Sequence, residues 1–106
     1  MKRGEVWWVD FEPAKGSEIR KKRRAIILTD NAVNRARRTL VVVPLSSSPN
    51  PQPPVVIPIP SAGKDSVAVC DQLRAVDKKR LSGQIGAIND AELRVLEKSV
   101  RAVLNL

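Results

Sequence analysis

Short runs of apolar residues, broken every few positions by glycine, proline or charge, cover most of this chain and are typical of β-strands. The first run spans residues 5–11 and ends before Pro13. Within it Trp7, Val9 and Phe11 share one face of a strand, and the remaining apolar residues share the other. A strand that is apolar on both faces predicts burial on both sides, or burial of one face against a partner.

A second strand is predicted for residues 25–28, an isoleucine-rich run too short for a buried helix. Five consecutive cations, residues 20–24, come directly before it. We expect Arg20 to Arg23 to lie in solvent at the mouth of this strand, while Arg24 is held by the strand itself. A fixed guanidinium at the rim of a sheet suits a bidentate grip on a phosphate. The alternative is that the charge run only keeps a strand edge soluble.

Short elements are predicted for the rest of the chain. Asp30-Asn31 can cap a helical turn, and Pro44 should weaken the pairing of its strand on one side, because proline has no N–H to donate. We predict a helical turn over 32–38, strands over 39–45, 55–60, 66–70 and 82–88, a stiff proline-rich loop over 49–54, an extended polar segment over 71–76 and a helical turn over 77–81.

The final segment is a predicted amphipathic helix. Asn89 and Glu92 form a capping box, and an apolar stripe beginning at Leu93 recurs at helical spacing. The fold class we expect is α+β and mostly β: a small antiparallel barrel, one domain over residues 1–106, with this C-terminal helix packed on the sheet.

Composition narrows the chemistry. The 106 residues carry 19 Lys and Arg against 11 Asp and Glu, a formal charge of +8 that favours a polyanionic partner, although a merely basic domain is the alternative. The chain has no histidine, so the commonest acid–base group and metal ligand is missing, and we expect no metal or other cofactor. Cys70 is the single cysteine, which excludes an internal disulfide and suggests a reducing, cytoplasmic location; no apolar run is long enough for a membrane span.

Three polar groups follow predicted strands: Arg24, the serines from Ser46 to Ser48, and the segment 71–74. Because strand ends converge in a small barrel, we expect all three to meet at one rim. A serine without histidine is a poor acyl-transfer nucleophile, but a hydroxyl beside an arginine can orient a phosphodiester. The plainer alternatives are a polar serine loop and an Asp71–Arg74 structural pair. Cys70 is expected to be a small core residue.

Five blocks of the sequence together resemble the MazF/PemK toxins, the messenger-RNA-cleaving halves of type II toxin–antitoxin pairs. The resemblance covers essentially the whole chain, with the blocks in the family's order. They are Lys2-Arg3-Gly4-Glu5-Val6-Trp7-Trp8-Val9-Asp10-Phe11, Gly16-Ser17-Glu18, Arg23-Arg24-Ala25-Ile26-Ile27-Leu28, Val43-Pro44-Leu45-Ser46-Ser47 and Cys70-Asp71-Gln72-Leu73-Arg74.

The resemblance implies a homodimer of SH3-like barrels with a groove at the dimer interface. It implies metal-independent, sequence-specific cleavage of single-stranded RNA, and a cognate MazE-like antitoxin whose acidic C-terminal segment blocks the groove. Arg24 and Ser46 match the positions that carry catalysis, and Asp71 matches an aspartate implicated in a plasmid-borne branch. Ala25 stands where the family usually has proline, and Val69 where that branch has an arginine.

The general base is open between Glu18 and Asp71, and the catalytic hydroxyl between Ser46 and Ser47. The residues expected to bind RNA are Arg20, Lys21, Lys22, Ser47, Gln72 and Arg74. Arg35, Arg37 and Arg38 are expected to add positive charge near the 20–24 run.

Two other functions are consistent with this sequence. One is a barrel that binds nucleic acid without cutting it. The other is a gyrase-directed toxin like the CcdB proteins, which use a tryptophan-containing C-terminal end; Leu104, Asn105 and Leu106 provide none.

Overall fold

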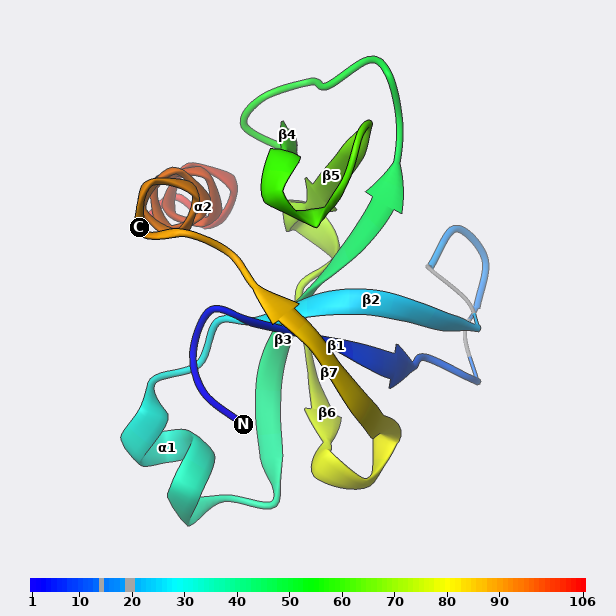
Figure 1. Cartoon of the computed structure of the whole chain (residues 1–106), viewed down its shortest axis with the longest axis vertical. Coiled ribbons are helices and arrows are strands. Elements are labelled where there is room, and N and C mark those ends of the chain that lie inside the picture. Colours follow the sequence, from blue (N-terminus) through cyan, green and yellow to red (C-terminus); the bar gives the residue numbers. More distant parts are fainter. Residues whose placement is uncertain (14, 19–20) are drawn as a thin grey trace.

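The computed structural model describes residues 1–13, 15–18 and 21–106. In these residues strands dominate, and one long helix closes the chain (Figure 1). The elements are β1 (Glu5–Asp10), β2 (Lys22–Ile27), α1 (Asn31–Ala36), β3 (Thr39–Ser47), β4 (Val56–Pro58), η1 (Pro60–Ala62), β5 (Ser66–Val69), η2 (Cys70–Gln72), β6 (Arg74–Asp77), η3 (Lys78–Arg80), β7 (Leu81–Ala87) and α2 (Asp90–Leu104), where η marks a single 3-10 turn.

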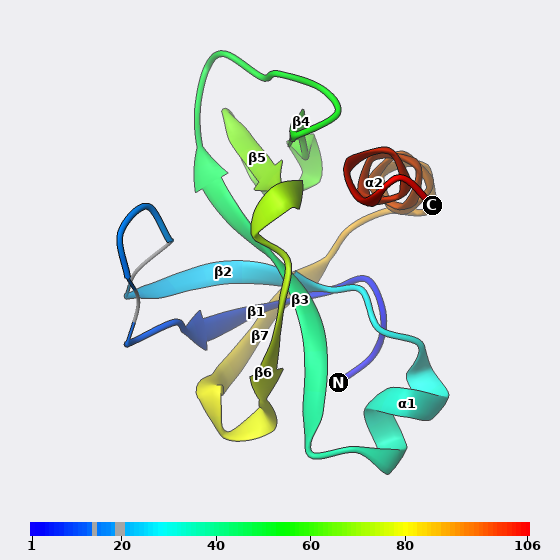
Figure 2. The ribbon, with the colours of Figure 1, turned by 180° about the vertical axis from the view of Figure 1, so that it is seen from behind.

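All strand pairs are antiparallel, in the order β4-β5-β3-β2-β1-β7, with β6 paired to β3 beside this path. The predicted mostly-β fold with a C-terminal helix is confirmed. The expected closure into a barrel is not: the two terminal strands of the path, β4 and β7, do not pair, and the sheet stays open. Figure 2, from behind, shows β4, β5 and α2 gathered at one end and α1 with the β6–β7 turn at the other.

Pro44 divides the outer edge of β3 between two partners. The N–H of Leu28 donates to Val41 O (2.9 Å). The backbone N–H and C=O groups of the odd-numbered residues of β3 therefore point toward β2, and those of the even-numbered residues point toward the opposite edge of the strand. On that edge β6 pairs with β3 up to Val42, and β5 pairs with it from Leu45 onward. Since proline has no N–H to offer there, the ladder breaks at Pro44, as the sequence predicted.

β1 contributes to two separate cores. Val6 packs with Ile26, Val43 and the α2 side chains of the first core, and Val9 packs with Ile27 in the second. The predicted two-sided burial of β1 is therefore provided by this chain itself. Trp8 is the exception on β1, since 43% of its surface is exposed.

Two strands extend further into polar sequence than predicted. β2 begins at Lys22 and β3 continues to Ser47, although both were expected to stop at the apolar residues. Each extension has a ladder partner: Lys22 lies opposite Asp10 of β1, and Ser47 lies opposite Ser66 of β5. Cross-strand pairing overrides the loss of apolar character at both ends.

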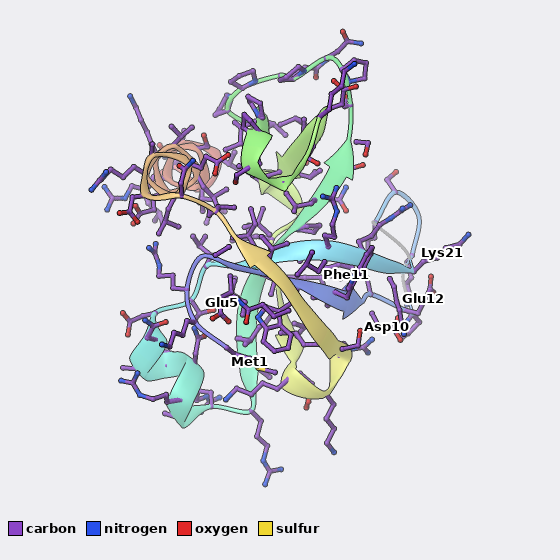
Figure 3. All side chains as sticks on the ribbon, viewed as in Figure 1. Met1, Glu5, Asp10, Phe11, Glu12 and Lys21 are labelled. Carbon is purple, nitrogen blue, oxygen red and sulfur yellow. The ribbon has the colours of Figure 1, made fainter. Side chains whose placement is uncertain are left out.

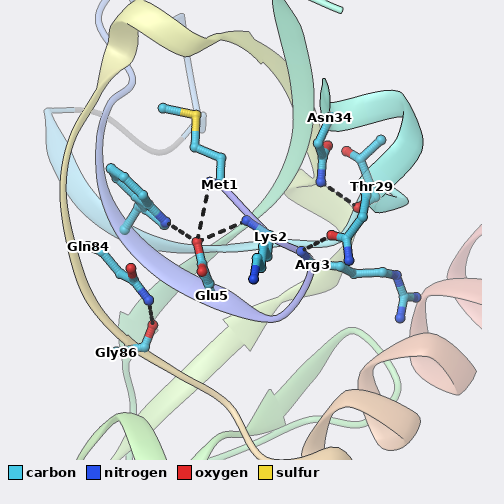
Figure 4. Close-up of polar contacts among 10 residues, drawn as sticks. Met1, Lys2, Arg3, Glu5, Thr29, Asn34, Gln84 and Gly86 are labelled. Atoms are coloured by element: carbon cyan, nitrogen blue, oxygen red, sulfur yellow. Dashed lines mark hydrogen bonds and ion pairs between the residues drawn. The ribbon is translucent and has the colours of Figure 1, made fainter. Parts of the chain in front are cut away.

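The amino-terminal residues are tied to the sheet by the Glu5 carboxylate (Figure 4). It accepts hydrogen bonds from the Lys2 N–H and the Trp7 indole N–H (both 2.9 Å) and lies 3.7 Å from the Met1 amino group. Burial raises the pKa of Glu5, but these hydrogen bonds and the positive charges outweigh burial and lower it.

The helix α2 has the predicted capping box, because the Asn89 side chain accepts from the Glu92 N–H and Glu92 accepts from the Asn89 N–H. Glu92 has a second role. Its carboxylate also accepts the Ser61 N–H (3.0 Å) and the Ser61 hydroxyl, so it fastens η1 to the start of α2. Burial raises the pKa of Glu92, and the bonds from Ser61 and Asn89 outweigh it, leaving the pKa lowered from 4.5.

Among the described residues, no helix has the length and apolar character needed to cross a membrane.

Replacing Glu92 with Gln should destabilise the protein by about 1–2 kcal/mol at pH 7, because a charge-assisted acceptor for three donors is lost. A carboxylate with a lowered folded-state pKa stabilises above the unfolded value of 4.5, and this stabilisation is lost as pH falls through the folded value. The difference between wild type and Glu92→Gln should therefore shrink below pH 4.5 in urea unfolding.

Asp90→Asn is the matched control, since Asp90 is an exposed carboxylate in the same helical turn. A Glu92→Gln penalty equal to that of Asp90→Asn, or one independent of pH, would show that the Ser61 contacts do not stabilise the fold.

Candidate functional site

Arg24 lies on the face of β2 that packs against η1 and β5. It pairs with Trp8 across the β1–β2 ladder and shares its face with Ile26 of the first core. Its guanidinium turns inward: Nη1 donates to the Ala62 carbonyl (2.5 Å) and Nη2 donates to the Ser66 hydroxyl (3.0 Å). The prediction that the strand holds Arg24 is confirmed, with the difference that η1 and β5 set its direction.

The acceptors for Arg24 are themselves fixed. Ser66 is only 4% exposed, and its hydroxyl donates to the Ala62 carbonyl at 3.1 Å. Gly63 between them has φ +124°, and a Cβ there would stand 3.4 Å from the Ser66 hydroxyl, so a side chain at this position is disfavoured. A guanidinium has five N–H groups, and Ala62 and Ser66 occupy two of its nitrogens, which leaves further donors for an anion.

A hollow of about 440 Å³ opens at the splayed ends of β2 and β3. Ser46 in it is half-buried and Ser47 is exposed. In the β3–β5 ladder Ser47 lies opposite Ser66, on the face of Arg24, whereas Ser46 lies opposite Val67 and points to the other face. The residues that line the hollow are Trp8, Lys22, Arg23, Arg24, Leu45, Ser46 and Ser47.

A second hollow of about 490 Å³ brings together four further predicted site residues, Glu18, Asp71, Gln72 and Arg74. Its floor is Phe11, a buried residue next to the ends of β1 and β2 (Figure 3), and the Arg74 guanidinium lies 5.6 Å from the Phe11 ring centre. Gln72 donates to the Ser17 carbonyl (3.4 Å), which ties the β1–β2 connection to η2. The lining residues are Phe11, Ser17, Glu18, Pro44, Asp71, Gln72, Leu73 and Arg74.

The expected meeting of all polar groups at one rim is therefore only partly correct. Arg24, Ser46 and Ser47 line one hollow, while Glu18, Asp71 and Arg74 line the other, and Ser48 lines neither of them. The physical reason is that successive side chains of a pleated strand point to opposite faces of the sheet. Arg24 is on the sheet face that carries the first core, whereas Arg74 pairs with Val42 on the face that carries the second core.

The suggested Asp71–Arg74 pair is wrong. Asp71 is exposed, and no ion pair joins it to Arg74 in the described part of the chain. Glu18 is exposed, and its carboxylate accepts the Lys15 N–H (2.5 Å).

The basic residues predicted to bind RNA have different positions. Arg20 lies outside the described residues. Lys21 is exposed, and its N–H donates to Glu12 (2.8 Å) (Figure 3). Lys22 is exposed in the Arg24 hollow.

The expectation that Arg35, Arg37 and Arg38 lie near the 20–24 run is wrong. Arg35 lies in the last turn of α1, and Arg37 and Arg38 follow that helix, at the end of β3 opposite to Ser46. β2 and β3 are antiparallel, so the start of β2 lies beside the end of β3 rather than its beginning.

Cys70 is a core residue, as predicted, with no exposed surface. Burial, and then the charge of Asp71, raise the pKa of Cys70 to about 11, so the thiol is protonated at neutral pH. Within the described ranges, no three His, Cys, Asp or Glu side chains come together as a metal-ligand set.

Sequence reasoning missed Ser66 and Ala62 as partners of Arg24, and Trp8 as an exposed aromatic in its hollow. No local signal marks Ser66 or Ala62, because they are 42 and 38 residues from Arg24. Trp8 had a signal in the sequence, since it is a large aromatic on the strand face opposite Val9 and Phe11.

The arrangement suits a phosphodiester. A guanidinium held by two acceptors presents its remaining N–H groups in a fixed direction, and serine hydroxyls stand at the adjoining strand end. An exposed indole beside them offers a surface on which a nucleic acid base can stack.

Comparison with known proteins gives a consistent result over the full length. The family model described as the PemK-like, MazF-like toxin of type II toxin–antitoxin system matches residues 2–104. Endoribonuclease MazF9 of Mycobacterium tuberculosis is 32% identical over 115 aligned positions, which cover 100% of this chain and 98% of that protein. Endoribonuclease MazF of Staphylococcus saprophyticus is 27% identical, covering 100% and 92%.

Solved structures share the fold. MazF from Deinococcus radiodurans superposes with a TM-score of 0.85 at 23% identity, covering 100% of this chain and 97% of that one. A mycobacterial endoribonuclease in complex with its cognate antitoxin gives a TM-score of 0.81 at 21% identity, with 100% and 96% covered.

Proposed function

This chain belongs to the PemK-like, MazF-like toxin family of type II toxin–antitoxin systems, and from that premise we propose that it is an endoribonuclease that cleaves single-stranded RNA in the Arg24 hollow. The observation that carries the proposal is the immobilised guanidinium: Arg24 is fixed on Ala62 and Ser66 with donors to spare, beside serine hydroxyls and an exposed tryptophan. The formal charge of +8 supports a polyanionic substrate.

The reaction needs no nucleophile from the protein. The 2′-oxygen of the ribose attacks the adjacent phosphorus and loses its proton, and the bond to the 5′-oxygen breaks as that oxygen gains a proton. The products are a 2′,3′-cyclic phosphate and a 5′-hydroxyl. Arg24 stabilises the charge that develops on the non-bridging oxygens, worth about 3 kcal/mol for one such donor. A serine hydroxyl of this hollow, from Ser46 or from Ser47, orients the phosphate or the 2′-hydroxyl for in-line attack.

The second hollow has a different role in this proposal. Arg74, Gln72, Glu18 and Asp71 contact the RNA on the far side of the β2 and β3 ends, and Glu18 or Asp71 acts as the base only for a 2′-hydroxyl that reaches this second hollow. Ser47 and Lys22 bind backbone in the Arg24 hollow, and Trp8 stacks on a base.

We expect cleavage to persist in excess chelator and to leave 5′-hydroxyl ends, because the chain contains no histidine and the reaction uses the substrate's own nucleophile. The measurement is incubation of the purified protein with mixed RNA in EDTA, followed by analysis of both new ends. Products that carry a 5′-phosphate would exclude this mechanism.

Arg24→Lys should lower the single-turnover cleavage rate by about 10²–10³ and weaken RNA binding much less, because lysine keeps the charge but loses the planar fork. Equilibrium binding is measured beside the rate. If rate and affinity fall together, Arg24 only binds, and the alternative of a barrel that does not cut gains support.

Ser46→Ala should lower the rate in the same selective way, but less than Arg24→Lys. Ser47→Ala is the matched control, since Ser47 shares the hollow and the face of Arg24. A larger loss in Ser47→Ala would move the catalytic hydroxyl to Ser47.

The partners follow from the same premise. A homodimer is supported by an apolar side chain of the sheet that is left exposed, Ile85 of β7 at 48%. An acidic antitoxin segment occupies the Arg24 hollow and excludes RNA, since both ligands need the same cations. No observation favours a gyrase target.

Sedimentation velocity at micromolar concentration should show a dimer, and an acidic, apolar segment of a cognate antitoxin should add mass and displace bound RNA. A monomer at this concentration contradicts the homodimer. Simultaneous binding of the segment and RNA contradicts the shared hollow.

A further inference from the structure

Five cations gather at the end of the molecule opposite to the Arg24 hollow. Arg35 lies in the last turn of α1, Arg37 and Arg38 lie between α1 and β3, and Lys78 and Lys79 belong to η3 at the end of β6; Figures 1 and 2 show α1 and the β6–β7 turn at the same end. They meet because β6 pairs with the start of β3, where the Lys78 N–H donates to the Arg38 carbonyl (2.9 Å). We call them the distal basic surface: Arg35, Arg37, Arg38, Lys78 and Lys79.

The charge of the distal basic surface is not neutralised by ion pairs. The ion pairs of the described residues join Met1 to Glu5 and Arg3 to Glu97, and neither involves this surface. Asp77 is the nearest acidic residue in the sequence, and its carboxylate accepts the Lys79 N–H (2.8 Å). Arg80 is left out of the surface, because its guanidinium donates to the Asp10 and Glu12 carbonyls.

The helix that carries part of the distal basic surface, α1, is held in place by hydrogen bonds. α1 is anchored by Asn34, which is 2% exposed and donates to the Thr29 carbonyl at 2.8 Å. Asp30 caps the helix by accepting the Ala32 N–H at 2.9 Å. A hollow of about 320 Å³ lies at the exit of α1, lined by Ala36, Arg37, Arg38 and Thr39. Cations on an anchored base lose less conformational freedom on binding than cations on a mobile tail.

The distal basic surface and the two hollows lie along the same strand, β3. β3 has nine residues, and at ~3.3 Å per residue its two ends lie about 26 Å apart. Ser47 is at one end and Thr39 at the other. Arg74, which lines the second hollow, pairs with Val42 between them. Cations therefore stand at both ends of β3 and near its middle, over a distance that corresponds to about eight phosphates of a stacked strand at ~3.4 Å each and to fewer phosphates of an extended strand.

We propose that the distal basic surface is a second RNA-binding site that holds the phosphate backbone of a long substrate away from the point of cleavage. The proposal rests on the proposed function. It explains why unpaired cations concentrate at this end, which the cleavage chemistry does not use. RNA fits better than an acidic protein segment, because protein partners need apolar anchors and Val33 is the single large apolar side chain of α1 with substantial exposure.

The test compares the wild type with the quadruple variant Arg37→Gln, Arg38→Gln, Lys78→Gln, Lys79→Gln. Two RNAs contain the same mapped cleavage site: one of roughly 30 nucleotides and one of roughly four, which is too short to span β3. The wild type should bind the long RNA more tightly than the short one. The variant should lose most of this advantage, so its affinity for the long RNA should fall by about tenfold. A plot of log K against log salt concentration for the long RNA should have a slope that is shallower by about three than that of the wild type.

The control variant is Arg94→Gln, Lys98→Gln, Arg101→Gln, which removes three exposed cations from the outer face of α2. It should retain the advantage of the long RNA and nearly the wild-type slope. Urea unfolding checks that both variants fold.

An unchanged affinity and slope in the quadruple variant would overturn the proposal. So would a variant that keeps its RNA affinity but loses binding to a glutamate-rich peptide, because the surface would then be a protein-binding site. Failure of the proposed function is distinguishable, since a wild type that binds both RNAs and cuts neither still gives the affinities and slopes.

Discussion

The missing N–H of Pro44 sets how the outer edge of β3 is paired. It falls on the edge of β3 that faces away from β2, so no single strand can pair along that whole edge. The chain instead supplies β5 to one half and β6 to the other, with the η2 turn between them. The second hollow, which Pro44 itself lines, lies at that break.

Arg24 shows how this architecture positions the guanidinium that we propose for catalysis. A surface arginine on a strand would sample many rotamers, but here η1 and β5 supply two acceptors at 2.5 and 3.0 Å. η1 is in turn fastened to α2 by Glu92 through Ser61. The C-terminal helix thus supports the direction of Arg24 without touching the hollow, and a capping residue contributes to both stability and site geometry.

The pairing of strands also determines where the positively charged residues lie. Cations are dispersed through the sequence, yet the antiparallel β2–β3 and β3–β6 pairs sort them to the two ends of β3. One group is next to the hydroxyls that suit phosphate chemistry, and the other is next to no candidate catalytic residue. In the proposed function the same excess charge therefore serves different steps, since backbone attraction acts over about 10 Å whereas transition-state stabilisation needs direct contact.

The sequence by itself determined the features that depend on neighbours in the chain. The alternation of residues along β1 predicted that Val6 and Val9 lie on opposite faces, and the spacing of Asn89 and Glu92 predicted the capping box. The apolar run that precedes Cys70 predicted that this residue is in the core, and Pro44 predicted the break in the ladder. The ordered blocks shared with a toxin family predicted the family as well. Only the tertiary structure decided that Lys22 and Ser47 belong to strands, that Ser66 and Ala62 hold Arg24, and that Asp71 stands apart from it. These outcomes depend on register between segments distant in sequence, and register is set by the packing of two whole faces rather than by any local pattern of residues.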